Sequence, residues 1–235
     1  MYNNINFHCI TSNETLKYTE STNTGLSSKE ANQRLANYGL NELNNDNKIS
    51  ILKLFLSQFK DFMIIILIFA AFISFIVSII EGNADIVDPI IILSIIIFNS
   101  IIGVVQEYKA ERSLESLKKL STPYSNVIRD NVIQIIPSSN LVVGDIILLE
   151  AGNFVPADAR LLEASNLKID ESALTGESLP VEKNHAITLS ESTPIAERKN
   201  MVYSSSIITY GRGKAIVTAT GSNTEVGQIA NLITN

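Results

Sequence analysis

The feature that most constrains this chain is an apolar run from Phe62 to Ile80, which reads FMIIILIFAAFISFIVSII. The run stays uncharged for about 19 residues, close to the roughly 20 that a helix needs to cross a bilayer. A buried core helix of a soluble protein is the alternative, but such helices rarely remain uncharged for so long. A signal peptide does not fit, since about sixty polar or mixed residues precede the run. The run is therefore predicted to span a membrane.

A second apolar run, from Pro89 to Val105, contains IIILSIIIFNSIIGVV. It is shorter and carries Asn99, but it becomes long enough if the apolar residues just before Pro89 extend it. A polar residue in hydrocarbon more often packs against another helix than binds an ion, so no ion site is assigned to Asn99. We predict a two-helix transmembrane hairpin over residues 61–107, with spans at about 62–80 and 86–105.

Basic residues flank the two runs and are absent between them. The connector EGNADIVDP contains Glu81, Asp85 and Asp88 but no Lys or Arg. The flanking basic residues are Lys48, Lys53, Lys60, Lys109, Arg112, Lys118 and Lys119. Because basic residues are retained on the cytoplasmic side, both flanking segments are predicted to be cytoplasmic. The chain is thus expected to be a multi-pass protein of the cell membrane, with the lipid bilayer as one partner.

Composition removes several other classes of function. The net charge of -6 gives no basic footprint for nucleic acid, so no nucleic-acid partner is predicted. Cys9 is the single cysteine and cannot form an internal disulfide. With His8 and His185 as the two histidines, the chain has no Cys/His pattern for zinc, and no metal site is predicted.

The N-terminal part divides into a tail and a short helical segment. Residues 1–25 are rich in Asn, Thr and Ser without periodicity and are expected to form a loose, flexible tail. Residues 26–60 are expected to be a cytoplasmic helical segment, because Ser27 and Glu30 have the spacing of a capping box and Gly39 supplies a C-terminal stop. The apolar face of this helix would be Ala31, Leu35 and Tyr38.

A helical stalk, residues 108–122, is predicted to continue the second membrane helix. The sequence QEYKAERSLESLKKL has no Gly or Pro to end a helix. Leu114 and Leu117 are three apart, and Glu115 has helical spacing to Lys118 and Lys119. An ordinary solvated helix end is the alternative reading.

Short β segments begin after the stalk and predict a mainly β domain over residues 123–235. VIRDNVIQII reads as a hairpin around Asp130 and Asn131. GDIILLEAG, ARLLEA and GKAIVTATG read as further strands bounded by Gly, Pro and Asp. Ser222 and Glu225 repeat the capping-box spacing and lead into a terminal helix.

One stretch, IDESALTGESLPVEK from Ile169 to Lys183, carries the most information about chemistry. TGES alone is compatible with a glycine turn bearing a solvated carboxylate. Its surroundings add specificity, namely GDIILLEAGNFVPADARLLEA before it, NMVYSSSIITYGRGKAIVTATGSNTEVGQIA after it, and FNSIIGVVQEYKAERSLESLKKL and GLSSKEANQRLANYGLNEL upstream. Together these segments resemble the front part of P-type cation-transporting ATPases of the type II, calcium-pump-like group, from Gly25 to Asn235.

The resemblance implies an α+β architecture, in which the β domain is an actuator domain with a distorted β-sandwich or jelly-roll fold. These pumps form an aspartyl phosphate that water later hydrolyses. The matching residue that would position this water is Glu177. In supporting roles, Gly176 would let the backbone come close to the phosphate, and Thr175 and Ser178 would orient the loop or hydrogen-bond phosphoryl oxygens. Asp170 and Glu171 are not taken as a metal pair, because adjacent acids usually diverge.

The resemblance also implies what this chain lacks. The phosphorylation motif, the nucleotide-binding domain and the later membrane helices are absent, and no Walker-type loop replaces them. ATP and Mg²⁺ are expected in the full-length enzyme and not on this chain. Its partners would be the phosphorylation and nucleotide-binding domains of the full-length pump, and this chain alone is expected to be inactive.

Two departures from the family pattern bear on its function. Ser205 and Ser206 stand where many relatives have Gly-Thr, and Lys60 stands where two-site calcium pumps often carry an acid. Lys60 favours the one-site calcium or manganese pumps and their bacterial relatives. Ca²⁺ is the transported cation that the motifs favour, with manganese, sodium or potassium, proton and magnesium transport left open. A stand-alone, non-catalytic membrane module that docks on a complete pump is the alternative function.

Overall fold

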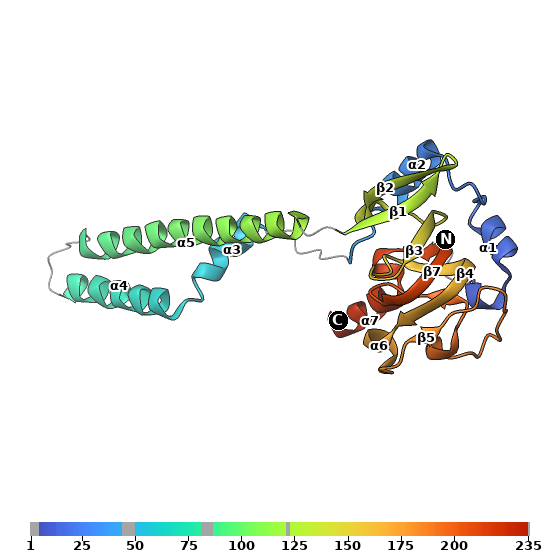
Figure 1. The fold of residues 1–235 in the computed structure, drawn as a ribbon. Coiled ribbons are helices and arrows are strands. Elements are labelled where there is room, and N and C mark those ends of the chain that lie inside the picture. The colour runs from blue at the N-terminus through green and yellow to red at the C-terminus, as the bar shows by residue number, and fades with distance from the viewer. Residues whose placement is uncertain (1–4, 44–49, 81–86, 121–122, 235) are drawn as a thin grey trace. The chain divides into compact units, whose positions relative to one another are not determined.

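The described residues, 5–43, 50–80, 87–120 and 123–234 of a computed structural model, fall into two units. One unit combines residues 1–44 with residues 122–235, and the other comprises residues 45–121. The first contains the strands and the second is helical (Figure 1). The chain therefore has the α+β composition predicted from sequence.

The helical unit contains α3 (Ile51–Gln58), α4 (Phe62–Ile80) and α5 (Val87–Leu120). Both α3 and α4 pack against α5 (Figure 1). Gly103 permits the close approach of α3, because a Cβ there would lie 2.4 Å from Gln58 Oε1. The same Gln58 donates a hydrogen bond to Glu107 on α5 over 3.0 Å.

Helix α5 extends without a break from the second apolar run through the predicted stalk as far as Leu120. The expected continuation of the backbone is confirmed, in keeping with the absence of Pro from residues 106–120 and the presence of good helix formers there. The contacts expected among the side chains of residues 114–119 lie outside the described part of the chain. So does most of the acidic connector between the two runs.

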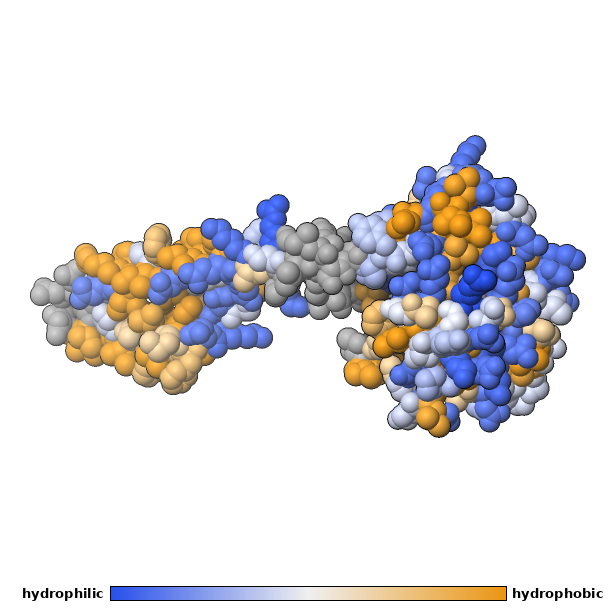
Figure 2. Space-filling view, in the orientation of Figure 1, coloured by the Kyte–Doolittle hydropathy of each residue, from blue (hydrophilic) through white to orange (hydrophobic). Residues whose placement is uncertain are grey.

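Among the described residues, one helical segment is by itself long and apolar enough to cross a membrane, Val87–Ala110 of α5. Helix α4 reaches that standard only together with α3, from which it is bent by 64°. Figure 2 shows apolar side chains over much of the surface of this unit. Phe69 and Phe98 are among its exposed apolar residues. The second predicted span is supported, whereas the complete hairpin stays a prediction.

Seven strands form one antiparallel sheet in the other unit, in the order β2-β1-β3-β7-β4-β5, with β6 also paired to β4. The strands are β1 (Tyr124–Arg129), β2 (Val132–Pro137), β3 (Ile146–Glu150), β4 (Asp158–Asp170), β5 (Val181–Glu182), β6 (Met201–Val202) and β7 (Ile207–Ala219). All of the segments predicted as strands are found. The finer description as a distorted β-sandwich or jelly-roll stays a prediction.

The predicted hairpin is present between β1 and β2. Asp130 and Asn131 form its turn with φ angles of 52° and 61°. Two consecutive positive φ angles match the twist of antiparallel strands, and Asn and Asp accept them more readily than most residues. The adjacent Asp and Asn were therefore enough to predict the turn from sequence.

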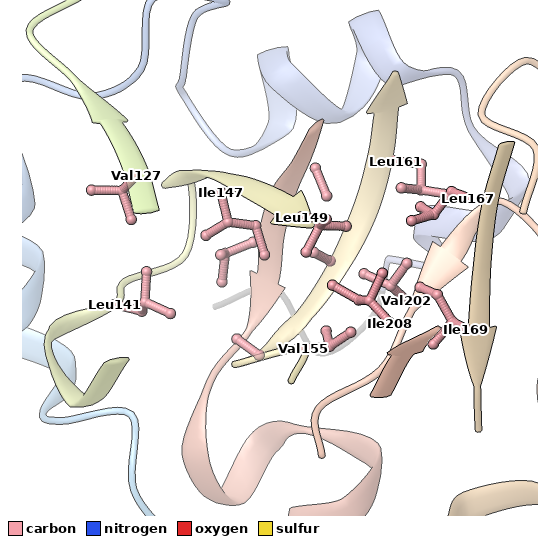
Figure 3. Close-up of a cluster of buried hydrophobic side chains, with 14 residues drawn as sticks. Val127, Leu141, Ile147, Leu149, Val155, Leu161, Leu167, Ile169, Val202 and Ile208 are labelled. Atoms are coloured by element: carbon pink, nitrogen blue, oxygen red, sulfur yellow. The ribbon is translucent and has the colours of Figure 1, made fainter. Parts of the chain in front are cut away.

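The core of this unit lies mainly on strands β3, β4 and β7, with further residues from β1, β6 and the loops beside them (Figure 3). Labelled members include Ile147, Leu149, Leu161 and Leu167, which are at most 2% exposed. Register shifts interrupt the long β4–β7 pairing at several points. Such bulges bend a strand, which lets these two strands curve around the core.

The expectation of a loose tail over residues 1–25 is wrong for its described part. Residues Phe7–Cys9 form a 3₁₀ turn, and α1 (Ser12–Tyr18) begins with a complete capping box between Thr11 and Glu14. Leu16 of α1 is buried against a cluster that includes Ile146 and Ile216 of the sheet. The T-x-x-E spacing was a readable signal, and burial of Leu16 stabilises the helix.

The second helix, α2 (Ser28–Tyr38), ends at Gly39 as predicted. Ser27 caps it by accepting a hydrogen bond from the Glu30 amide, but the Glu30 carboxylate instead pairs with Arg34 at 2.8 Å. The buried face also differs from expectation. Arg34 is buried with Ala31 and donates to the Thr19 and Val143 carbonyls, whereas Tyr38 is exposed.

The terminal helix α7 (Glu225–Thr234) starts from a different cap than predicted. Thr224 accepts a hydrogen bond from the Gly227 amide, while Ser222 lies in a preceding 3₁₀ turn. Asp158 at the start of β4 joins this helix to the sheet, because its carboxylate accepts from the Glu225 amide at 2.7 Å and the Ser204 amide at 2.8 Å. Burial raises the pKa of Asp158 to about 7, even though these amides favour the charged form.

Leu16 tests whether α1 belongs to the folded unit. We expect Leu16→Ala to lower the free energy of unfolding by about 2–4 kcal/mol, because it leaves a cavity under α1. The matched control is Lys17→Ala at an exposed position of the same helix, with an expected change below about 0.5 kcal/mol. Pulse proteolysis of the whole chain in detergent along a urea gradient would measure both. Equally small effects would mean that α1 is only loosely attached.

Asp158 makes stability depend on pH. Its raised pKa means that the native state binds the proton more tightly than the unfolded chain, so the stability it contributes is full below about pH 4 and lost as pH rises towards 7. As pH rises through that window, the unfolding free energy of wild type should therefore fall by about 1.4 kcal/mol per pH unit relative to that of Asp158→Asn. Urea unfolding at several pH values measures this difference. A constant difference would show that the two amides keep the pKa of Asp158 low.

Candidate functional site

The TGES residues lie in the connection between β4 and β5, two paired strands at one end of the sheet order. The pairing of Ile169 with Val181 and of Lys168 with Glu182 closes the base of this connection. A single helical turn, α6 (Ser172–Thr175), fills its first half. The candidate site is thus a loop with a fixed base.

Two adjacent acids begin the loop and point to different partners. Asp170 accepts a hydrogen bond from the Ser172 amide at 2.9 Å, and hydrogen bonding from the Ser172 side chain and amide lowers the pKa of Asp170. Glu171 turns inward and forms an ion pair with Lys183 at 2.6 Å. The two carboxylates do not converge, and no cluster of three or more metal-binding side chains occurs among the described residues.

Gly176 ends the helical turn in a left-handed conformation, with φ 76° and ψ 0°. An L side chain would be strained at this φ, so the residue type follows from backbone geometry. A Cβ at this position would meet no atom within 4 Å. The open space beside Gly176 is compatible with the predicted close approach of a phosphate group.

Thr175 has a hydroxyl that connects both halves of the loop. It donates to the Glu171 carbonyl over 3.1 Å and accepts from the Glu177 amide over 3.3 Å. This hydroxyl therefore fixes the backbone on either side of Gly176. Of the two roles predicted for Thr175, orienting the loop and binding phosphoryl oxygens, its contacts in this structure perform the first.

Glu177 and Ser178 lie at the exposed end of the loop, followed by Leu179, which is 80% exposed. Within the described residues, the Glu177 carboxylate takes part in no hydrogen bond or ion pair. An unpaired carboxylate on the surface can orient a water molecule and accept a proton from it. The four predicted site residues are thus brought together on one loop, with the backbone held and the carboxylate exposed.

A buried ion pair lies behind the loop, and neither of its members was predicted from sequence to have this role. The Lys183 ammonium is buried and lies 5.9 Å from the centre of the Tyr203 ring. Burial raises the pKa of Glu171, against the pull of Lys183, and lowers the pKa of Lys183. The two charged residues are 12 positions apart in sequence, and no local pattern indicated that the loop would bring them into contact.

Comparison with known proteins agrees with this arrangement. Residues 119–234 match the P-type ATPase actuator domain, and residues 7–74 match the cation transporter/ATPase N-terminus. The calcium-transporting ATPase lmo0841 of Listeria monocytogenes is 46% identical over 220 residues, which is 94% of this chain and 24% of that protein.

Further relatives differ in the cation that their names give. Calcium-transporting ATPase 1 of Bacillus cereus is 41% identical over 97% of this chain and 26% of its own length. The sodium/potassium exporting P-type ATPase cta3 of Schizosaccharomyces pombe is 42% identical over 91% of this chain and 20% of its own length. The chain spans about a quarter of the length of the curated relatives it matches.

The match over residues 7–74 includes the N-terminal helices of the strand unit and the first part of the helical unit, and the match over residues 119–234 includes all seven strands and the TGES loop. The similarity extends over nearly the whole chain in each of these relatives. This chain therefore belongs to the P-type cation-transporting ATPase family, of which it carries the N-terminal segment and the actuator domain.

Proposed function

We propose that this chain is the leading part of an ATP-driven cation pump and that Glu177 positions the water that hydrolyses its aspartyl phosphate. The observation that carries the proposal is an unpaired carboxylate at the exposed end of a loop whose backbone is fixed on both sides by Thr175. Water must approach the phosphorus in line with the leaving oxygen, and a placed carboxylate can both orient that water and accept its proton.

Each loop residue has a role compatible with its contacts. Gly176 leaves one side of the backbone open to a phosphoryl group. Ser178 is exposed and can donate its hydroxyl to a phosphoryl oxygen, whereas the hydroxyl of Thr175 is engaged within the loop. ATP and Mg²⁺ would be bound by the phosphorylation and nucleotide-binding domains of the longer protein, which supply the phosphoryl chemistry.

Calcium is the cation we favour for transport by the complete protein. Several relatives are named calcium-transporting ATPases, and two of them cover 94% and 97% of this chain. The sodium/potassium exporting relative, at 42% identity, keeps other cations open, including manganese, protons and magnesium. We place the complete pump in the cell membrane with the TGES loop on the cytoplasmic side, in line with the basic flanks of the apolar helices.

Replacement of Glu177 tests the catalytic role. In the pump extended by its genomic continuation, Glu177→Ala should let the phosphoenzyme form from ATP but slow its hydrolysis by about 10²–10⁴-fold, because the water loses its general base. The decay of ³²P-labelled enzyme after a chase with unlabelled ATP measures the rate. The matched control is Glu182→Ala, an exposed acid on β5 at the base of the same loop, which should decay like wild type. Normal decay in Glu177→Ala would remove the assignment.

The same labelling assay tests the transported cation and the incompleteness of this chain. We expect calcium to stimulate label on the extended protein and no label on the 235-residue chain alone. Stimulation by sodium or manganese instead would reassign the cation. Absence of label on both would favour a module that docks on a separate pump, and label on the short chain would mean that the phosphorylated residue lies within it.

A further inference from the structure

The two ends of the TGES loop are joined by a buried ion pair that its catalytic motif does not include. Glu171 precedes the helical turn and Lys183 follows β5, and their charged groups lie 2.6 Å apart. Both side chains are completely buried, at 0% exposure. The second carboxylate oxygen of Glu171 has no hydrogen-bond partner in the described part of the chain. Each charge therefore depends on the other.

Other restraints at the base of the loop are few. Strand β5 consists of two residues at the end of the sheet order, and it pairs with β4 at two positions. The Lys183 amide adds one bond to the Leu167 carbonyl at 2.9 Å. A short edge strand opens easily, whereas loss of one member of the buried ion pair leaves the other charge buried without a partner at a high cost.

A continuous set of bonds leads from this ion pair to Glu177. The Glu171 carbonyl accepts hydrogen bonds from the Thr175 amide, at 2.9 Å, and from the Thr175 hydroxyl. The Thr175 hydroxyl in turn accepts from the Glu177 amide. Holding the Glu171 side chain in the interior thus also holds the backbone that carries the Glu177 carboxylate.

We propose that the Glu171–Lys183 ion pair is a positioning device for Glu177, which fixes the TGES loop relative to the sheet. Breaking the pair would leave a charge buried without a partner, so the pair strongly disfavours any loop position that separates its members. Glu171 and Lys183 are positioning residues and do not touch the reacting atoms. The catalytic consequence rests on the proposed function of Glu177, whereas the effect on the loop does not.

Proteolysis of this chain tests the positioning directly. A glutamate-specific endoprotease should cut the Glu177–Ser178 bond at least about tenfold faster in Lys183→Met than in wild type, since cleavage tracks how often the segment opens. Cleavage after Glu163, in the middle of β4, reports opening of the sheet and should not change. Mass spectrometry resolves the two products in one sample.

Two controls separate this pair from ion pairs in general. Lys214→Met breaks the exposed pair between Lys214 and Glu163 at 3.1 Å in the same sheet. Asp145→Asn weakens the buried pair between Arg129 and Asp145, which lies between β1 and the loop before β3. Neither should speed cleavage after Glu177. Lys183→Arg keeps the charge and should stay within about threefold of wild type.

The outcomes decide the positioning role. Unchanged cleavage after Glu177 in Lys183→Met overturns it. Equal acceleration after Glu163 also overturns it, because the pair would then support the whole sheet and not the loop. Glu171→Gln provides a second variant of similar shape, and it should reproduce the effect of Lys183→Met if the ion pair is the cause.

Phosphoenzyme kinetics in the extended pump test the consequence for the reaction. Lys183→Met should slow hydrolysis by about 10–100-fold without slowing phosphoenzyme formation, a split that general instability would not produce. Lys183→Arg should restore the rate. Normal phosphoenzyme decay in Glu177→Ala would contradict the proposed function of Glu177. The positioning role of the ion pair would then still be tested by the proteolysis experiment. Slow decay in Glu177→Ala with wild-type decay in Lys183→Met would overturn the link between the ion pair and hydrolysis.

Discussion

The pairing of β4 with β7 is the interaction on which the rest of the strand unit depends. These strands are each 13 residues long and lie next to each other within the sheet, and β3, β5 and β6 attach to one or the other. Asp158 at the start of β4 holds the N-terminus of α7, and Asp170 at its end begins the TGES loop. One strand thus places both features, and its bulges set their directions.

Buried charges in this unit are stabilised in three different ways, one by backbone carbonyls and two by ion pairs. Arg160 on β4 has no carboxylate partner among the described residues and donates to the carbonyls of Ile10, Leu161, His185, Ile187 and Asn200. Burial lowers the pKa of Arg160 to about 10, so it remains charged at neutral pH. Because its partners come from distant parts of the chain, this one side chain joins the N-terminal segment to the long loop before β6.

The other two solutions are ion pairs with different geometry. Arg129 binds Asp145 through two nitrogens at 2.8 and 2.6 Å, and the Val142 amide adds a third hydrogen bond to that carboxylate. Glu171 and Lys183 instead have a single close contact, and neither charged group has a further hydrogen-bond partner among the described residues. Ion pairs with more hydrogen bonds offset more of the cost of removing their charges from water. The Arg129–Asp145 pair is therefore suited to stabilising the fold, whereas the Glu171–Lys183 pair is better explained by the loop that it positions.

Sequence reasoning was reliable where the determining signal was local. The hairpin at Asp130 and Asn131, the start of α2 at Ser27 and the continuity of α5 each follow from a few adjacent residues. The loop residues Thr175 to Ser178 could be named as candidates because a motif carries them together. Only the family resemblance, and no pattern of periodicity, suggested the chemistry proposed for Glu177, which stays a prediction.

Predictions failed where tertiary contacts chose between local options. Thr11 and Glu14 carry the same cap spacing that was recognised at Ser27, yet burial of Leu16 against the sheet decides that α1 is part of the fold. At the chain's last helix, two hydroxyl residues compete for the cap, and Thr224 is selected because Asp158 receives the Glu225 amide. Neither Asp158 nor Lys183 could be assigned a partner from sequence, since their contacts lie 67 and 12 positions away.

The division of the TGES loop into a fixed base and a free carboxylate has a physical rationale. If Glu177 is delivered to a phosphoryl group on another domain, its carboxylate must be unpaired before contact, because any internal partner would have to be displaced. A fully flexible loop would then lose much of its freedom at the moment of reaction, at a cost in rate. Internal bonds to the backbone through Thr175 and Glu171 remove that freedom in advance, and they leave the carboxylate itself exposed to water.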